Sequence, residues 1–123
     1  MPRPILPESR IHPAIREKIA ASRMAIVREV EAAIAAHEIV VVGMAVNFAA
    51  RKARRLLDAA GIRYKYLEYG GYLSEWRRRN ALKMWTGWPT FPMVFVKGVL
   101  IGGASDLGRL IESGELRAPS RTP

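Results

Sequence analysis

Apolar residues recur at helical spacing in the first third of the chain, and charged residues lie between them. The recurring positions are Ile15, Ile19, Ile26, Val30 and Ile34. Their steps of four and seven residues place side chains on one face of an α-helix. The segment is rich in alanine and has no internal glycine or proline, so the pattern predicts a helix from Ala14 to about His37.

Strand and helix patterns alternate after this helix. Residues 39–42 form a continuous β-branched run, which is typical of a central strand buried on both faces. Residues 48–60 have helical periodicity and end before Gly61, a favoured helix stop. Residues 62–67 alternate between apolar and polar, as a half-exposed strand does. This order predicts two parallel strands joined by a right-handed crossover.

The second half of the chain predicts a short helix, a hairpin and a last helix. The short basic helix is expected at residues 72–84, and a two-residue turn joins strands at 93–96 and 99–101. The last helix is expected at residues 105–113, with Ser105 as its N-cap. The whole order indicates an α/β protein with a four-stranded mixed sheet and helices on both faces.

The chain of 123 residues has the length of one domain. Residues 1–13 contain four prolines and predict an extended arm, residues 14–115 predict a single domain, and residues 116–123 predict a flexible tail. The arm lacks the apolar core of a signal peptide. No apolar run approaches the ~20 residues that span a bilayer. We therefore expect a soluble cytoplasmic protein that does not contact a membrane.

Basic residues outnumber acidic ones, with 20 Lys and Arg against 11 Asp and Glu and a formal charge of +9. Such a field attracts nucleic acid, acidic proteins, lipid headgroups or small anions. The charges are spread along the whole chain, so a solvated basic surface is an equally good interpretation. The chain has no cysteine, which excludes disulfides, thiolate metal ligands and thiol nucleophiles.

Three motifs follow one another at the ends of the predicted elements. Asn47 lies between a buried strand and a helix, Trp88-Pro89-Thr90-Phe91-Pro92 precedes the hairpin, and Gly102-Gly103-Ala104-Ser105-Asp106 follows it. This arrangement resembles the glutaredoxins, especially the monothiol branch, over about residues 36–115. The resemblance implies a thioredoxin-like fold with an extra N-terminal helix.

The resemblance also locates the family's reactive cysteine. Matched through the helix that follows, the first cysteine of the family motif falls on Asn47 and the fourth motif position on Ala50. In the family this cysteine is the nucleophile, and in monothiol members it also binds a [2Fe-2S] cluster. A carboxamide can take neither role. We expect no thiol–disulfide exchange and no iron–sulfur cluster, and the family's glutathione-binding lysine falls on Met44.

The remainder of the family's glutathione cleft has counterparts in this chain. The residue before the family's cis-proline pairs its backbone with the cysteinyl part of glutathione, a helix N-terminus binds the γ-glutamyl end, and a basic residue contacts the glycyl carboxylate. The resemblance assigns these roles, together with the cysteine position, to Asn47, Arg79, Thr90, Phe91, Pro92, Gly103, Ala104, Ser105 and Asp106. A carboxylate ligand at a helix N-terminus is physically favourable.

Several alternatives stay open at this stage. Gly102-Gly103 can be a simple turn, Arg79 can be surface charge, and the three tryptophans can be packing residues.

One hypothesis for the function is a redox-inactive glutaredoxin-like protein that binds glutathione or another γ-glutamyl compound. The other is a basic module that binds nucleic acid, the less favoured partner, or an acidic protein. An enzyme of another class is disfavoured, since no catalytic triad, metal triad or phosphate loop is present. The N-terminal helix can pack over the sheet or extend into a dimer contact.

Overall fold

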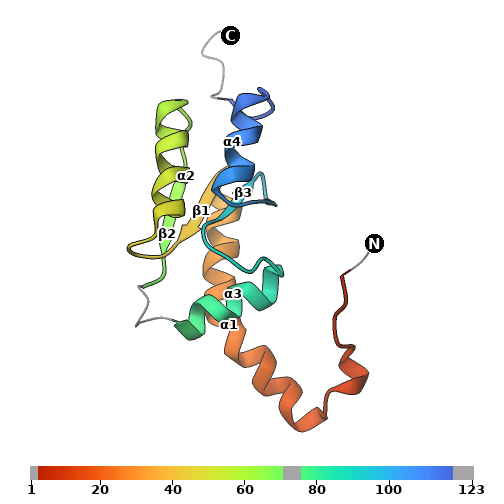
Figure 1. The fold of residues 1–123 in the computed structure, drawn as a ribbon. Helices are drawn as coiled ribbons and strands as arrows, with labels where there is room; N and C mark the ends of the chain where they lie inside the picture. The colour runs from red at the N-terminus through yellow and green to blue at the C-terminus, as the bar shows by residue number, and fades with distance from the viewer. Residues whose placement is uncertain (1–2, 71–75, 118–123) are drawn as a thin grey trace.

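The computed structural model describes residues 3–70 and 76–117, without the side chains of residues 19–24. Figure 1 shows how the helices and strands are arranged. In chain order they are η1 (Glu8–Arg10), α1 (Pro13–Ala36), β1 (Ile39–Gly43), α2 (Phe48–Ala59), β2 (Lys65–Glu68), α3 (Trp76–Thr86), β3 (Met93–Val96), β4 (Val99–Gly102) and α4 (Ala104–Glu112).

The four strands form one mixed sheet in the order β2-β1-β3-β4. β1 and β2 are parallel, whereas β3 is antiparallel to both β1 and β4. The predicted parallel pair and the predicted hairpin are therefore confirmed. The chain has the thioredoxin-like fold, with helices on both faces of the sheet and an additional N-terminal helix.

Alternate residues of β1 belong to two separate cores, which explains its uninterrupted apolar sequence. Val40 and Val42 pack in the core beneath α1 and α3. Ile39 and Val41 pack in the core beneath α2 and α4. Since successive side chains of a strand point to opposite faces, both faces of β1 must be apolar.

Only the second half of α1 covers the sheet. Ile26 and Val30 are buried and Ile34 packs at the edge of the same core. Figure 1 shows the first half of α1 reaching beyond the sheet, with the N-terminal arm at its end. Ile15 is accordingly 45% exposed, although its spacing places it in the apolar pattern. Helical periodicity identifies a face of a helix, but the sheet beneath it is too short to cover that face completely.

Two predicted boundaries differ from the structure by two residues or more. β2 starts at Lys65 rather than at residue 62, because the Ile62 N–H bonds to the carbonyl of Leu57 at the end of α2. α3 ends at Thr86 rather than at residue 84. Its predicted start at residue 72 lies outside the described residues, as do residues 118–123 of the predicted tail.

The predicted N-cap at Ser105 is wrong. α4 begins at Ala104, so the N-cap is Gly103 and Ser105 lies inside the first turn. Gly103 has no side chain with which to cap the helix, and the Asp106 carboxylate instead accepts a hydrogen bond from the Gly103 N–H at 3.0 Å. An acidic side chain at this third helical position compensates for the missing cap because it also favours the positive end of the helix dipole.

Candidate functional site

Asn47 is the N-cap of α2, at the place where the chain leaves β1. Its side-chain Oδ1 accepts a hydrogen bond from the backbone N–H of Ala50 at 2.8 Å. The first and fourth positions of the family motif are thus joined directly in this chain. Asn47 is half-buried, whereas Phe48 beside it is 85% exposed.

The segment before β3 lies at the same end of the sheet as Asn47. Val42 in β1 pairs with Met93 in β3, so the loops that follow Val42 and precede Met93 leave the sheet together. Phe91 and Pro92 are buried, Thr90 is exposed, and the Phe91–Pro92 peptide bond is cis. Within residues 3–70 and 76–117, neither the N–H nor the C=O of Phe91 has a hydrogen-bond partner.

The start of α4 packs against this segment. A Cβ atom placed on Gly103 would lie 3.5 Å from the carbonyl oxygen of Pro92 and 3.9 Å from Nε1 of Trp88. The backbone of α4 therefore approaches the Pro92 loop closely. The N–H groups of Ala104 and Ser105, in the first turn, have no acceptor within the helix.

Arg79 lies inside the protein rather than on its surface. It is buried in α3, and its Nη1 donates a hydrogen bond to the carbonyl oxygen of Tyr69 at 2.9 Å. The neighbouring Arg77 and Arg78 are exposed. Leu82, three residues further on, shares the buried face. This spacing is the sequence signal that separates Arg79 from the two other arginines of the run.

Met44 does not replace the family's lysine. Its side chain is buried in the same core as Phe91 and the α3 side chains. An apolar side chain in a core offers no charge to a carboxylate. The family's lysine contact is therefore absent at this position.

A cavity of about 230 Å³ adjoins Asn47 on the side of β2. Sequence reasoning did not identify this cavity, whose polar lining includes Arg51, Arg54, Tyr66 and Glu68. Apart from Asn47, the residues expected to bind glutathione do not line it. Gly43 leaves room for the Tyr66 hydroxyl, which would lie only 2.8 Å from a Cβ atom at that position.

Tyr66 is held in its neutral form within this cavity. Burial is the main cause that raises the pKa of Tyr66 to about 12, and a hydrogen bond to Glu68 adds to it. The Tyr66 hydroxyl donates to Glu68 Oε1 at 3.1 Å. The Arg54 guanidinium lies 4.2 Å from the centre of the Tyr66 ring, a cation–π contact. Its positive charge opposes the upward shift of the pKa without cancelling it.

The donors at this end of the sheet do not fit an iron–sulfur cluster. Such clusters are held by thiolates, and the chain has no cysteine. The Asn47 oxygen already accepts the Ala50 N–H. No group of three or more His, Asp or Glu side chains suited to a metal ion occurs in the part of the chain that the structure describes.

Comparison with known proteins identifies the family. Residues 50–101 match the glutaredoxin family profile. A glutaredoxin-like protein of Dictyostelium discoideum is 46% identical over 91 residues, which cover 74% of each chain. A protein of Legionella pneumophila named as a probable monothiol glutaredoxin is 36% identical over 70 residues, covering 57% of this chain and 74% of that protein. The chain belongs to the glutaredoxin family, and it is a member without cysteine.

Solved structures agree with this assignment. A buckwheat glutaredoxin–glutathione complex superposes with a TM-score of 0.67, at 24% identity over 82% of this chain and 88% of the other. A wheat glutaredoxin has a TM-score of 0.65 and 29% identity, covering 76% and 85%. Other relatives are much longer. The chloroplastic glutaredoxin-S16 of Arabidopsis thaliana is 38% identical over 61 residues, which make up 50% of this chain and 21% of that protein. No described helix is long and apolar enough to cross a membrane.

Proposed function

We propose that this protein is a redox-inactive glutaredoxin that still binds glutathione, or another γ-glutamyl compound, and acts as a ligand-binding protein or scaffold. One observation carries the proposal. Gly103 at the start of α4 packs against Pro92, and this contact brings the free backbone of Phe91 next to the free N–H groups of the α4 N-terminus. An extended peptide with a carboxylate end suits such a pair of segments.

The chemistry of the two segments supports a γ-glutamyl ligand. The N–H groups of Ala104 and Ser105 suit its α-carboxylate, because the helix dipole stabilises an anion there. The Asp106 carboxylate, half-buried beside them, suits its α-amino group. Phe91 offers one donor and one acceptor to the peptide backbone of the ligand. The buckwheat relative, whose structure is that of a glutaredoxin–glutathione complex, has the same fold.

The glycyl end of the ligand has weaker support. Met44 offers no charge, and Arg79 already donates one hydrogen bond to Tyr69. We assign the glycyl carboxylate to Arg79, as the resemblance implies. Met44 offers no charge-assisted hydrogen bond to this carboxylate, and one donor of Arg79 is already used by Tyr69. We therefore expect weaker binding than a site with both the family's lysine and its arginine would give.

Isothermal titration calorimetry with reduced glutathione tests the proposal. Binding is expected for glutathione and not for the dipeptide cysteinylglycine, which lacks the γ-glutamyl group. Asp106→Ala should abolish binding, whereas Asp58→Ala, an exposed carboxylate in α2, should leave it unchanged. A dissociation constant for glutathione above ~10 mM, equal to about −2.7 kcal/mol, would remove the ligand-binding function.

Restoring the thiol is an independent test of the cleft. The Asn47→Cys variant places a thiol at the N-terminus of α2, a position that lowers a thiol pKa. We expect glutathione-dependent reduction of a mixed disulfide by this variant and none by the unaltered chain. A Ser105→Cys variant is the control for a thiol elsewhere in the cleft. If Asn47→Cys is folded and inactive, the cleft no longer holds glutathione near this position.

A further inference from the structure

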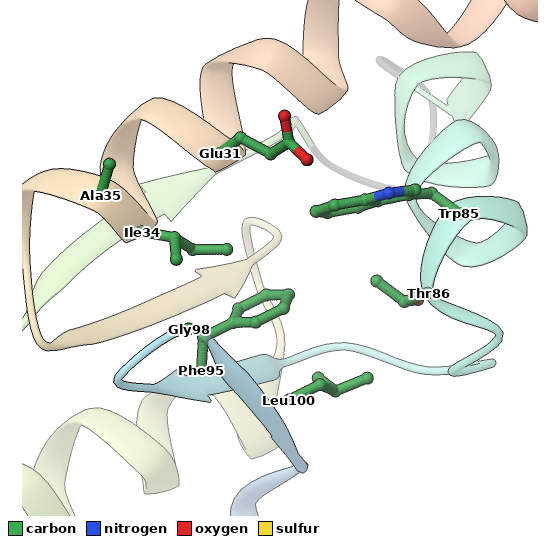
Figure 2. A pocket seen from close by; sticks show the side chains of 8 residues that line it. All are labelled: Glu31, Ile34, Ala35, Trp85, Thr86, Phe95, Gly98 and Leu100. Atoms are coloured by element: carbon green, nitrogen blue, oxygen red, sulfur yellow. The ribbon is translucent and has the colours of Figure 1, made fainter.

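Two cavities of this protein differ in the chemistry of their walls. The larger, of about 450 Å³, lies between α1, α3 and the β3–β4 hairpin. Figure 2 shows Ile34, Trp85 and Phe95 around it, and Glu31 is the one charged residue of its described lining. The smaller cavity, beside Asn47, has arginine and glutamate side chains in its wall. Charges of both signs around one small space suit a polar ligand, because an apolar occupant would leave them desolvated.

The charged side chains of the smaller cavity come from α2 and β2, and their spacing in the sequence places them together. Arg51 and Arg54 are three residues apart on α2, so they share one face of the helix. Tyr66 and Glu68 are two residues apart on β2, so they share one face of the strand. Because both pairs line the same cavity, two guanidinium groups and one carboxylate lie around one small space.

The charges around this cavity are unequal and unpaired. Among the residues that the structure describes, neither Arg51 nor Arg54 forms an ion pair. Glu68 accepts the neutral hydroxyl of Tyr66 through Oε1, which leaves its second oxygen available as an acceptor. Like charges at this spacing on a helix repel each other. A ligand with negative groups near the arginines and a positive group near Glu68 would compensate all three charges.

Contacts within the protein hold parts of the cavity wall in place. The Arg54 guanidinium lies 4.2 Å from the centre of the Tyr66 ring, and stacking of this kind leaves the guanidinium N–H groups able to donate at their edge. The N–H of Ala45 bonds to the carbonyl of Gly70 at 2.7 Å, which fixes the turn between β1 and α2. A ligand would therefore enter a largely preformed site, which lowers the entropic cost of binding.

The position and the volume of the cavity suit a small metabolite. Met44, directly after β1, and Glu68, the last residue of β2, both line it, so it lies at the carboxyl ends of two parallel strands. Open α/β sheets bind ligands at such strand ends. A volume of about 230 Å³ has room for about seven or eight water molecules at ~30 Å³ each. Pockets for drug-sized ligands measure ~300–1,000 Å³, so the occupant is smaller.

We propose that this cavity is a second ligand site that binds a free acidic amino acid, with its two carboxylates at Arg51 and Arg54 and its ammonium group at Glu68. The charges of such a ligand match those of the described cavity wall in number and sign. Asn47 uses its side-chain oxygen to cap α2, and its amide N–H groups can donate to a ligand carboxylate. The site meets the glutathione cleft only at Asn47, so this inference does not rest on the proposed function.

Isothermal titration calorimetry of the full chain with L-glutamate tests the proposal. We expect a dissociation constant below ~1 mM. Glutarate, which lacks the ammonium group, and L-glutamine, which lacks the second carboxylate, should each bind at least about fivefold more weakly. Absence of L-glutamate binding would overturn the proposal. Equally tight binding of glutarate or of inorganic phosphate would also overturn it, because the site would then accept any anion.

Variants of the cavity wall show which groups bind the ligand. Arg51→Gln and Arg54→Gln should each raise the dissociation constant for L-glutamate by at least about fivefold. Arg55→Gln, at an exposed arginine of α2 outside the cavity lining, is the matched control and should not change it. Glu68→Gln keeps an acceptor for the Tyr66 hydroxyl and should abolish the preference for L-glutamate over glutarate. Equal effects of the three arginine variants would mean that net charge alone attracts the ligand, which contradicts a specific site.

Nuclear magnetic resonance separates this site from the glutathione cleft. On addition of L-glutamate, the amide resonances of Ala45, Ala50 and Glu68 should shift, and Arg54→Gln should abolish these shifts. Shifts confined to Ala104 and Ser105 would place the amino acid at the N-terminus of α4 and would refute a second site. These measurements use no glutathione, so a negative result here leaves the glutathione titration as a separate test of the proposed function.

Discussion

The side-chain oxygen of Asn47 accepts the backbone N–H of Ala50 at 2.8 Å, at the two positions where the glutaredoxin motif begins and ends. A helix N-terminus presents N–H groups that need an acceptor. In this chain the neutral amide oxygen of Asn47 is that acceptor. The start of α2 therefore keeps a capped geometry without a reactive group. Loss of the thiol therefore leaves a stabilising contact in its place.

This contact predicts the stability of variants at position 47. Asn47→Ala removes the acceptor and should lower the free energy of unfolding by about 1 kcal/mol. Asn47→Asp keeps an acceptor and should stay within about 0.5 kcal/mol of the unaltered protein. Urea denaturation measures both. Asn80→Ala, at an exposed position inside α3, is the control and should be neutral or slightly stabilising. Equal losses in all three variants would contradict a capping role.

Tyr66 should titrate above the ordinary pH range of a tyrosine. Burial and the hydrogen bond to Glu68 raise its pKa to about 12 from 10.0. The folded state therefore holds this proton more tightly than the unfolded state. The resulting stability is complete below pH 10 and is lost as the pH rises toward about 12. Ultraviolet absorbance of tyrosinate measures the titration.

Two variants assign this late titration step. Tyr66→Phe should remove it. Glu68→Gln should shift it to lower pH, because a negative charge beside the phenolate is lost, while burial keeps the pKa above its ordinary value. If Tyr66 itself ionises near pH 10, its hydroxyl does not occupy the partly buried position beside Gly43.

The sequence pattern was sufficient to predict the strands of the sheet, but not to predict how much of each helix packs against it. The apolar run at β1 predicted a strand buried on both faces, and Val40 and Val41 lie in two different cores. The spacing of Ile15 could not show that α1 extends past the sheet, because periodicity is a property of the helix alone. How much of a helical face is covered depends on the length of the element beneath it.

In the candidate site, too, some residues could be predicted from the sequence and others could not. Short motifs identified Asn47 and Asp106 by their positions at helix starts. The cavity beside Asn47 is lined by Tyr66, which also lies against Gly43 although the two residues are far apart in sequence. That contact follows from the parallel register that pairs Val41 with Tyr66. One sequence does not specify such a register, so the role of Tyr66 could not be predicted.

The contact between Gly43 and Tyr66 predicts a steric cost at position 43. A Cβ atom there would lie 2.8 Å from the Tyr66 hydroxyl and 3.0 Å from the Cβ of Ala50. Gly43→Ala should therefore destabilise the protein by about 1–3 kcal/mol. Combining it with Tyr66→Phe should recover part of this loss, because the closest atom is removed. Thermal or urea unfolding of the double-mutant cycle measures the coupling.

Gly108→Ala is the matched control for this substitution. Gly108 lies inside α4, and a Cβ atom there would meet only a methyl group of Leu56 at 3.6 Å, an ordinary contact distance. Alanine is the better helix former, so this variant should gain about 0.5–1 kcal/mol. Opposite signs at the two glycines are expected. A Gly43→Ala variant as stable as the parent would show that Tyr66 lies elsewhere.

Val46, directly before Asn47, has a left-handed backbone conformation with φ of 54°. This conformation costs a residue with a Cβ atom about 1–2 kcal/mol, and a β-branched side chain is especially unsuited to it. The side chain is 69% exposed, so little burial is lost when it is removed. Val46→Gly should therefore raise the free energy of unfolding, by about 0.5–1 kcal/mol after the greater entropy of glycine in the unfolded chain is subtracted.

Val99→Gly is the control, because Val99 is a similarly exposed valine at the start of β4 without positive φ. That variant should lower stability, since glycine weakens a strand. Urea denaturation of the two variants separates backbone strain from side-chain loss, because both remove the same exposed side chain. Relief of strain at position 46 requires the two changes in stability to have opposite signs. If both variants are destabilised alike, Val46 does not hold the left-handed conformation in solution.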